Sequence, residues 1–142
     1  NSVKRLVVTV PQMAELEIGF DLWFDRVKNI ASQLSIPIVF YANKTTTEAL
    51  KKQCEIHSSL NVSFRELASW EDFLIISKDI KHSDTLIVIT ARKATMSYNN
   101  LFEKIPYYLN KYFADNNFLL IYPQQTAPDG TDNDIYNPLK IS

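Results

Sequence analysis

KRLVVTV, at Lys4–Val10, and TLIVITA, at Thr85–Ala91, are the two stretches that decide the fold. Both are rich in apolar and β-branched residues, and polar residues stand mainly at their ends. A strand with one wet face alternates apolar and polar residues, whereas a strand covered on both faces has an almost continuous apolar run. The uninterrupted apolar centre Leu86–Ile89 predicts a strand in the middle of a parallel sheet.

Three further segments complete the predicted sheet. Ile36–Ala42 (IPIVFYA) has the same buried character, and a proline near the start of a strand is tolerated. Asn61–Leu67 (NVSFREL) alternates apolar and polar residues, which is typical of an edge strand with one wet face. Phe118–Tyr122 (FLLIY) is closed by Pro123 and predicts the last strand.

Helical spacing separates these strands. From Leu16 the apolar residues recur three and four positions apart, which predicts one long helix with Glu15 and Glu17 near the positive end of its dipole. The apolar positions of that helix are Phe20, Trp23, Phe24, Val27, Ile30, Ala31 and Leu34.

Polar residues indicate where the other helices begin. Thr45 and Glu48 have the spacing of a capping box, which predicts a helix that runs to about His57. Ser69 and Asp72 indicate another helix start. Pro106 suits the first turn of a helix but not its interior, so we expect a short turn and then a helix that begins near this residue.

Strands that alternate with helices predict an α/β fold, a five-stranded parallel sheet with helices on both faces in a Rossmann-like three-layer sandwich. The length of 142 residues fits one domain that needs no disulfide or metal. We place that domain at residues 1–123. Residues 124–142, rich in Pro, Asp, Asn and Gly, read as a tail that is loose or laid on the surface.

Charge and composition exclude several classes of protein. Fifteen basic and sixteen acidic residues give a net charge of -1, and the two signs are interspersed, which argues against nucleic acid and anionic membranes as partners. A lone cysteine, Cys54, fits a reducing compartment. We expect a soluble fragment, because no apolar run is long enough to span a bilayer and no signal peptide is visible. The start at Asn1, without methionine, suggests a piece cut from a longer protein or an expression remnant.

The order of elements resembles the universal stress protein fold. Several segments are similar to the cytoplasmic C-terminal domain of bacterial cation:proton antiporters of the monovalent cation/proton antiporter-2 type. The segments are Val8–Trp23 with its MAELEIGFDLWFDR continuation, Pro37–Asn43 (PIVFYAN), Phe64–Phe73 (FRELASWEDF), Thr85–Arg92 (TLIVITAR) and Phe118–Gln124 (FLLIYPQ).

This resemblance implies a membrane parent whose transmembrane antiporter domain precedes this chain. The domain would lie at the cytoplasmic face of the inner membrane, form a homodimer and regulate or assemble the transporter without catalysing a reaction. None of the transport residues would be present here. One alternative is a stand-alone universal stress-like protein that binds an adenine nucleotide and dimerises. Another is an oligomerisation module whose last strand and tail pair across a two-fold axis.

A ligand crevice is expected beyond the carboxyl ends of the first and fourth strands, where the strand order reverses. Arg92 and Lys93 could hold an anion there, and the hydroxyls of Thr95 and Ser97 could donate to phosphate. A solvated basic loop is the simpler interpretation of the same residues. The full predicted lining is Thr9, Val10, Pro11, Gln12, Thr90, Arg92, Lys93, Thr95 and Ser97.

ATP or AMP is disfavoured as a cofactor in this crevice. Universal stress proteins that bind ATP carry a G-x-x-G-x9-G-[ST] run after the fourth strand and an aspartate after the first. Here Pro11 follows the first strand, and the loop ARKATMSYNN contains no glycine. Glycine lets backbone amides approach phosphates closely, so we expect no resident cofactor.

Catalytic and metal-binding patterns are weak. His57 and His82 read as surface histidines, and Cys54 reads as a packing residue within a helix. Asp21 and Asp25 share a helix face, but that face is the solvated one. The tail residues Asp129, Asp132 and Asp134 lack the glycine and glutamate that complete a calcium loop. We therefore expect neither an enzyme nor a metal site.

Overall fold

The computed structural model describes residues 3–56, 60–91 and 95–124, and it contains one five-stranded sheet. The strands, in spatial order, are β3 (Val62–Glu66), β2 (Ile38–Ala42), β1 (Arg5–Thr9), β4 (Asp84–Ile89) and β5 (Asn117–Ile121). All four neighbouring pairs are parallel. The predicted α/β fold with a five-stranded parallel sheet is therefore confirmed.

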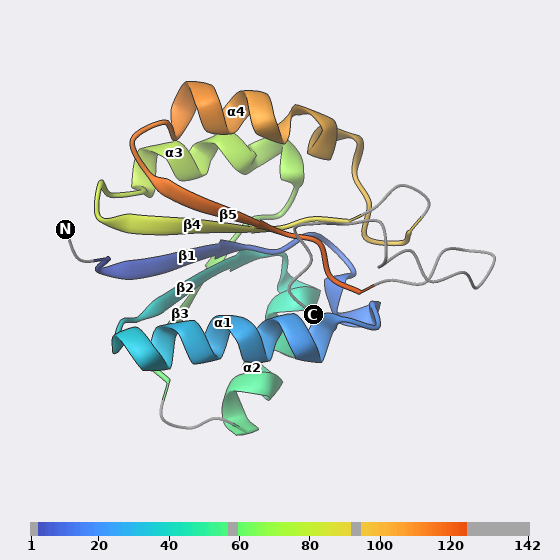
Figure 1. The fold of residues 1–142 in the computed structure, drawn as a ribbon. Coiled ribbons are helices and arrows are strands. Elements are labelled where there is room, and N and C mark those ends of the chain that lie inside the picture. Colours follow the sequence, from blue (N-terminus) through green and yellow to red (C-terminus); the bar gives the residue numbers. More distant parts are fainter. Residues whose placement is uncertain (1–2, 57–59, 92–94, 125–142) are drawn as a thin grey trace.

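Helices cover both faces of the sheet, as Figure 1 shows. The lower layer in that view holds α1 (Phe20–Leu34) and α2 (Lys44–Ile56). The upper layer holds α3 (Ile76–Asp79) and α4 (Ile105–Tyr112), each preceded by a 3-10 helix, η2 (Trp70–Ile75) and η3 (Asn100–Lys104). No helix in the described part of the chain combines the length and the apolar character needed to cross a bilayer.

Successive side chains of each central strand pack into two separate hydrophobic cores, one on each face of the sheet. Leu6 and Val8 of β1 pack into the α1 and α2 layer, while Val7 between them packs into the α3 and α4 layer. In the first layer the Phe40 ring stacks between Phe24 and Phe64, with centroid distances of 5.8 Å on both sides. In the second layer Trp70 stacks on Phe73 at 5.1 Å. Burial on both faces explains why the central strands are apolar throughout.

Two predicted helix starts are wrong in detail. The long helix begins at Phe20 instead of Leu16, because residues Ala14–Leu16 form a separate 3-10 turn, η1. The α2 helix begins at Lys44, and its first turn is capped by Asn43, whose Oδ1 accepts a 2.8 Å bond from the Thr46 backbone N–H. Thr45 is therefore not the cap. Asparagine caps as well as serine or threonine does, so its side chain competes successfully at this position.

The other two helix starts agree with the sequence. The Ser69 hydroxyl accepts a bond from the Glu71 backbone N–H, although the element that follows is the 3-10 helix η2 before it becomes α3. Pro106 lies in the first turn of α4, after the short η3 turn. The boundary predicted at residue 124 falls at the end of the described residues, and residues 125–142 lie outside them.

Candidate functional site

The chain reverses its direction of travel across the sheet between β1 and β4. From β1 it moves outward to β2 and β3, and it then returns to the other side of β1 for β4 and β5. The loops that leave β1 and β4 therefore diverge at the carboxyl end of the sheet, which is the usual place for a ligand crevice in this architecture. Of the predicted site residues that the structure describes, Thr9 ends β1 and the others lie on these two loops.

On the β1 side, three of the four predicted residues are buried. Thr9, Val10 and Pro11 have little contact with solvent, and only Gln12 is exposed. The Gln12 side-chain amide donates a 3.2 Å bond to the Ala68 carbonyl, which ties the loop after β1 to the segment before η2. The Thr9 hydroxyl is buried and has no hydrogen-bond partner within the described part of the chain. Thr9, Val10 and Pro11 are thus packed against the protein, and Gln12 is the predicted residue on this side that reaches solvent.

On the β4 side, the structure describes Thr90, Thr95 and Ser97, while Arg92 and Lys93 lie outside the described residues. The buried Thr90 hydroxyl donates a 3.0 Å bond to the Ile121 carbonyl of β5 and is thereby committed to the sheet. Ser97 is also buried, and Thr95 is half-buried. The predicted anion role of the two basic residues stays a prediction.

Glu17 is a residue of this site that the sequence pattern did not single out. Its carboxylate oxygen Oε2 accepts hydrogen bonds from both the hydroxyl and the backbone N–H of Ser97, the latter at 3.2 Å. A serine hydroxyl and a loop N–H are the kinds of group that donate hydrogen bonds to a phosphate oxygen in phosphate-binding sites. Here both groups donate to the Glu17 carboxylate instead. The carboxyl end of the sheet, where the crevice was predicted, therefore holds an anionic group supplied by the chain itself.

Glu15 makes the corresponding contact on the other side of the turn. Its Oε1 accepts a 2.8 Å bond from the hydroxyl of Thr46, a buried residue in the first turn of α2. The η1 turn between β1 and α1 thus binds the element after β2 through Glu15 and the loop after β4 through Glu17. Both glutamates were expected to lie near the positive end of a helix dipole, and the prediction named no side-chain partner for them. Their partners are distant in sequence, so no local pattern could have revealed them.

Gly19 closes the same end of the molecule from the side of β5. Its backbone N–H donates a 2.8 Å bond to the Gln124 carbonyl. A Cβ atom at this position would lie 2.5 Å from the Gln124 nitrogen, which is too close for any side chain. One of the two glycines of the chain is therefore used to bring two backbone segments together.

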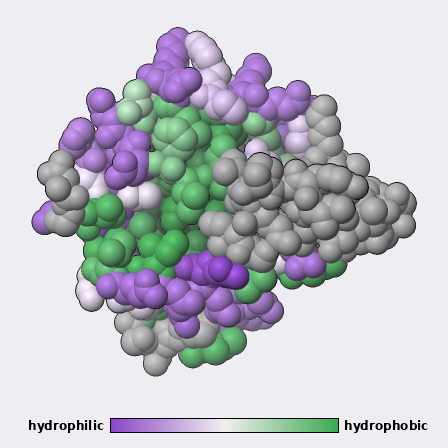
Figure 2. Space-filling view, viewed as in Figure 1, coloured by the Kyte–Doolittle hydropathy of each residue, from purple (hydrophilic) through white to green (hydrophobic). Residues whose placement is uncertain are grey.

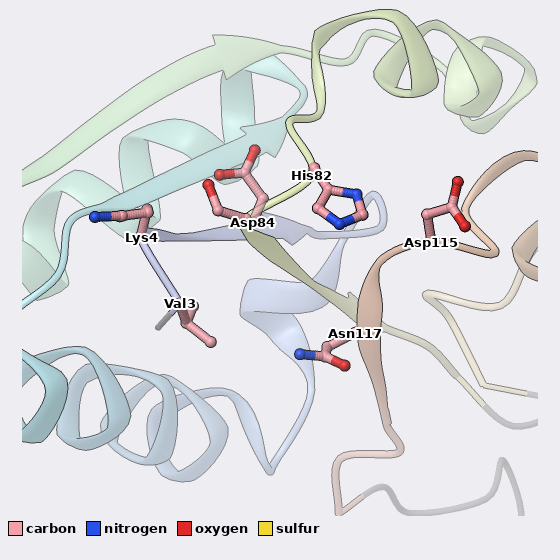
Figure 3. Close-up of a pocket in the computed structure, with 7 residues that line it drawn as sticks. Val3, Lys4, His82, Asp84, Asp115 and Asn117 are labelled. Carbon is pink, nitrogen blue, oxygen red and sulfur yellow. The ribbon is translucent and has the colours of Figure 1, made fainter. Parts of the chain in front are cut away.

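The opposite end of the sheet, where the strands begin, carries a polar depression of about 600 Å³, drawn in Figure 3. Its residues precede or begin three strands: Val3 and Lys4 before β1, His82 to Asp84 at β4, and Asp115 with Asn117 at β5. Asp84 is already engaged, because Arg5 binds both of its carboxylate oxygens at 2.7 and 3.1 Å. His82 and Asp115 are exposed. The depression lies at the amino ends of the strands. Its buried charged residue, Asp84, is already paired with Arg5.

The catalytic and metal candidates do not converge within the described residues. These residues contain no group of three or more His, Cys, Asp or Glu side chains that could hold a metal ion. Burial raises the pKa of the half-buried Cys54 thiol, which disfavours the reactive thiolate. Asp21 accepts a 2.6 Å bond from Gln53 on α2. His57, Asp129, Asp132 and Asp134 lie outside the described residues.

Comparison with models of protein families, with curated proteins and with solved structures returned no match to this chain.

Proposed function

We propose that this chain is a non-catalytic regulatory or assembly domain of a monovalent cation:proton antiporter. It would lie at the cytoplasmic face of the inner membrane and follow a transmembrane antiporter domain in the same parent chain. The support for the parent is the resemblance of the five quoted segments, which fall on β1 with α1, on β2, on β3 with η2, on β4 and on β5. The segment MAELEIGFDLWFDR supplies Glu15 of the η1 turn and Glu17 at its C-terminal cap.

The observation that carries the nucleotide-free part of this proposal is the contact between Glu17 and Ser97. A phosphate brought to the same donors would meet a carboxylate at close range. Two like charges about 4 Å apart repel by roughly 4 kcal/mol at an effective dielectric constant of about 20. The loop after β4 also lacks the glycines that would let its amides wrap a triphosphate. Both features favour a binding or assembly role over nucleotide hydrolysis.

Transport measurements on the parent test the function. Everted membrane vesicles would carry either the whole antiporter or a version without residues 1–142. Cation-dependent proton release would be measured as the reversal of fluorescence quenching. We expect the truncated protein to retain antiport but to change its dependence on pH or on cation concentration. Identical dependence and identical oligomeric state in the two versions would contradict the proposal, as would a parent reading frame without membrane helices.

The position of β5 at the edge of the sheet favours homodimer formation as the assembly role. Among the described residues this strand pairs with β4 only, and Phe118 is 45 % exposed. Figure 2 shows hydrophobic residues gathered on the face where Figure 1 places β5, between the two helical layers. An apolar edge strand with unpaired backbone groups is a ready site for pairing with another strand. A second copy of the same strand can supply that pairing in antiparallel orientation across a two-fold axis.

Sedimentation of the isolated chain checks this assembly. We expect a dimer for the native chain and a monomer after Phe118→Lys, because a charge on an edge strand opposes strand pairing. Leu34→Lys is the matched control, since Leu34 is 52 % exposed at the end of α1 and away from β5. A native chain that sediments as a monomer at all concentrations would contradict the homodimer.

A further inference from the structure

The β3 strand lies at the edge of the sheet opposite β5, and a row of its backbone groups points away from β2. Among the described residues this strand pairs with β2 only. The Leu67 N–H donates a 2.9 Å bond to the Ala42 carbonyl of β2, so the odd-numbered residues of this segment face β2. Because backbone direction alternates along a strand, the N–H and C=O groups of Val62, Phe64 and Glu66 face outward. A further strand can pair at this edge.

A groove runs beside this edge, between β3 and α2. It consists of two adjoining depressions of about 460 and 690 Å³, which share Glu48, Lys51 and Phe64 as lining residues. The Phe64 ring stacks on the buried Phe40 ring at 5.8 Å, and the Lys51 ammonium lies 5.7 Å from the Phe64 centroid. A strand added to β3 therefore places alternate side chains over an aromatic surface.

Charge does not select the occupant of this groove, because side chains of both signs line it. Glu48 and Lys51 form a pair at 3.7 Å. A groove of mixed charge beside an unpaired strand edge fits an extended segment that binds through its backbone and its apolar side chains. The basic lining residues are Lys44, Lys51, Lys52 and Arg65, and the acidic ones are Glu48, Glu55 and Glu66.

The tail of the chain begins close to the groove. Gln124 is held by the Gly19 N–H at 2.8 Å, and Figure 1 shows the end of β5 beside the η1 turn. That turn is bonded through Glu15 to Thr46, in the first turn of α2, where the groove begins. The strand order places β3 roughly 19 Å from β5, at about 4.8 Å per strand, whereas residues 125–134 span up to about 33 Å. A tether of this length gives the next residues an effective concentration of about a millimolar.

The sequence of the tail contains one stretch with the pattern of such a strand, 135–141 (IYNPLKI), which lies outside the described residues. Proline has no N–H to donate, so Pro138 fits where its nitrogen faces away from the neighbouring strand. The odd-numbered residues of the stretch then face β3, and their side chains lie on the same face of the sheet as Phe64. Those residues are Ile135, Asn137, Leu139 and Ile141, and three of them are aliphatic.

We propose that residues 135–141 of this chain pair with the edge of β3 as an antiparallel strand. The tail arrives at Glu66, the last residue of β3, so the added strand runs in the opposite direction. Leu139 and its aliphatic neighbours contact Phe64 in the groove, and Pro138 lies on the new outer edge, where it opposes further pairing.

This pairing covers one edge of the described sheet and leaves β5 for a second copy of the chain. Association through two different edges produces open-ended assemblies, whereas association through one edge produces a closed dimer. The role in limiting assembly rests on the proposed homodimer, but the pairing of the tail with β3 does not.

Amide hydrogen exchange of the full chain, followed by NMR, tests the pairing. The Phe64 and Glu66 amides should exchange at least about tenfold more slowly in the native chain than in Leu139→Pro, because that proline removes a donor that faces β3. Lys140→Pro is the matched control, since its nitrogen faces away from β3, and it should keep the slow exchange. The Arg65 amide faces β2, so it should exchange slowly in all three proteins and report that the sheet is intact.

Three results would overturn the proposal: equal exchange of the Phe64 amide in the native chain and in Leu139→Pro, an equal gain in exchange rate in both proline variants, or protection that decreases as the chain is diluted. The last result would assign the groove to the tail of a second copy. None of these measurements depends on transport by the parent or on sedimentation of the Phe118→Lys variant, so failure of the tail pairing and failure of the proposed function are distinguishable.

Discussion

Asp84 is a charged side chain buried at the start of β4, and its bonds hold the amino end of the sheet together. It binds the Arg5 guanidinium through both oxygens and also accepts a 2.8 Å bond from the Lys81 backbone N–H. The hydrogen bonds and charge of Asp84 raise the pKa of Arg5. Arg5 lies on β1, the neighbouring strand, so one carboxylate fixes two strands and the turn that precedes β4.

Asp84→Asn tests this arrangement. The amide keeps the shape but presents N–H donors where a carboxylate accepted bonds, so one donor is left facing another. We expect a loss of about 2–3 kcal/mol in the free energy of unfolding, measured with urea. Glu48→Gln is the control, because its 3.7 Å pair with Lys51 is exposed and should contribute less than about 0.5 kcal/mol. Equal effects of the two variants would contradict the assignment.

Tyr41 makes a contribution to the stability of the chain that is lost at alkaline pH. Its hydroxyl donates a 3.2 Å bond to Asp79, and burial, followed by the charge of Asp79, raises the pKa of the phenol. The neutral phenol is therefore favoured in the folded state. The resulting stability is complete below the unfolded pKa of about 10 and is lost as the pH rises through the higher folded value.

Tyr41→Phe should remove this dependence. At pH 8 the variant should be less stable than the native chain by about 1 kcal/mol, the contribution of one hydrogen bond. Between pH 9 and pH 11 the difference should shrink, because only the native chain ionises a buried phenol at this position. Urea unfolding at several pH values provides the measurement, and the remaining tyrosines act equally in both proteins. A difference that stays constant with pH would show that the Tyr41 phenol titrates normally.

At the scale of elements, aromatic packing joins α1 to the edge of the sheet. Phe24 of α1, Phe40 of β2 and Phe64 of β3 form one stack across three elements. Phe40 is fully buried, whereas Phe64 is half-buried at the sheet edge. The central ring therefore contributes more than the outer one, because it loses contacts on both sides when it is removed.

Phe40→Ala and Phe64→Ala measure this difference. We expect losses in unfolding free energy of about 3–5 kcal/mol for Phe40→Ala and about 1–2 kcal/mol for Phe64→Ala. The double variant should lose less than the sum by about 0.5–1.5 kcal/mol, the usual coupling between stacked rings. Additive losses would show that the two rings do not interact energetically.

The elements also show which features a sequence can predict. The three central strands β2, β1 and β4 were predicted because burial on both faces leaves a continuous apolar run, and the alternation in Val62–Glu66 correctly predicted an edge strand. β5 was predicted from its apolar run as well, although it lies at the other edge and is partly exposed. Pro106 predicted the start of α4 because the proline ring restricts the backbone directly. The start of α1 was missed because Leu16 continues the apolar period, although it is exposed on the η1 turn. A period in sequence does not report which apolar residues are left in water.

At the scale of the whole molecule, the strand order reverses between β1 and β4, and the side chains at the carboxyl ends of these strands decide what this end of the sheet accepts. The reversal between β1 and β4 was expected from the order of elements. The contact of Glu17 with Ser97 was not, because the two residues are eighty positions apart in the chain. The close approach of Gly19 to Gln124 was hidden for the same reason. Contacts made by the fold, and not by local sequence, determine the chemistry at this end.

Nucleotide titration tests that conclusion on the intact chain. Isothermal calorimetry with ATP and with AMP should show no saturable heat at micromolar concentrations, because a repulsion of about 4 kcal/mol corresponds to a loss of roughly a thousandfold in affinity. Stoichiometric micromolar binding of either nucleotide would contradict the exclusion of phosphate by Glu17. It would also favour the stand-alone universal stress-like protein over the antiporter domain.

The strand order has a consequence for synthesis on the ribosome. β1 is made first but occupies the middle of the sheet, between β2 and β4. Its second edge must wait until residues 84–89 have left the exit tunnel, and during that interval a row of apolar side chains and backbone amides is uncovered. A nascent chain of this kind is a substrate for chaperones that shield emerging strands, and pausing of translation before β4 would lengthen its exposure to aggregation.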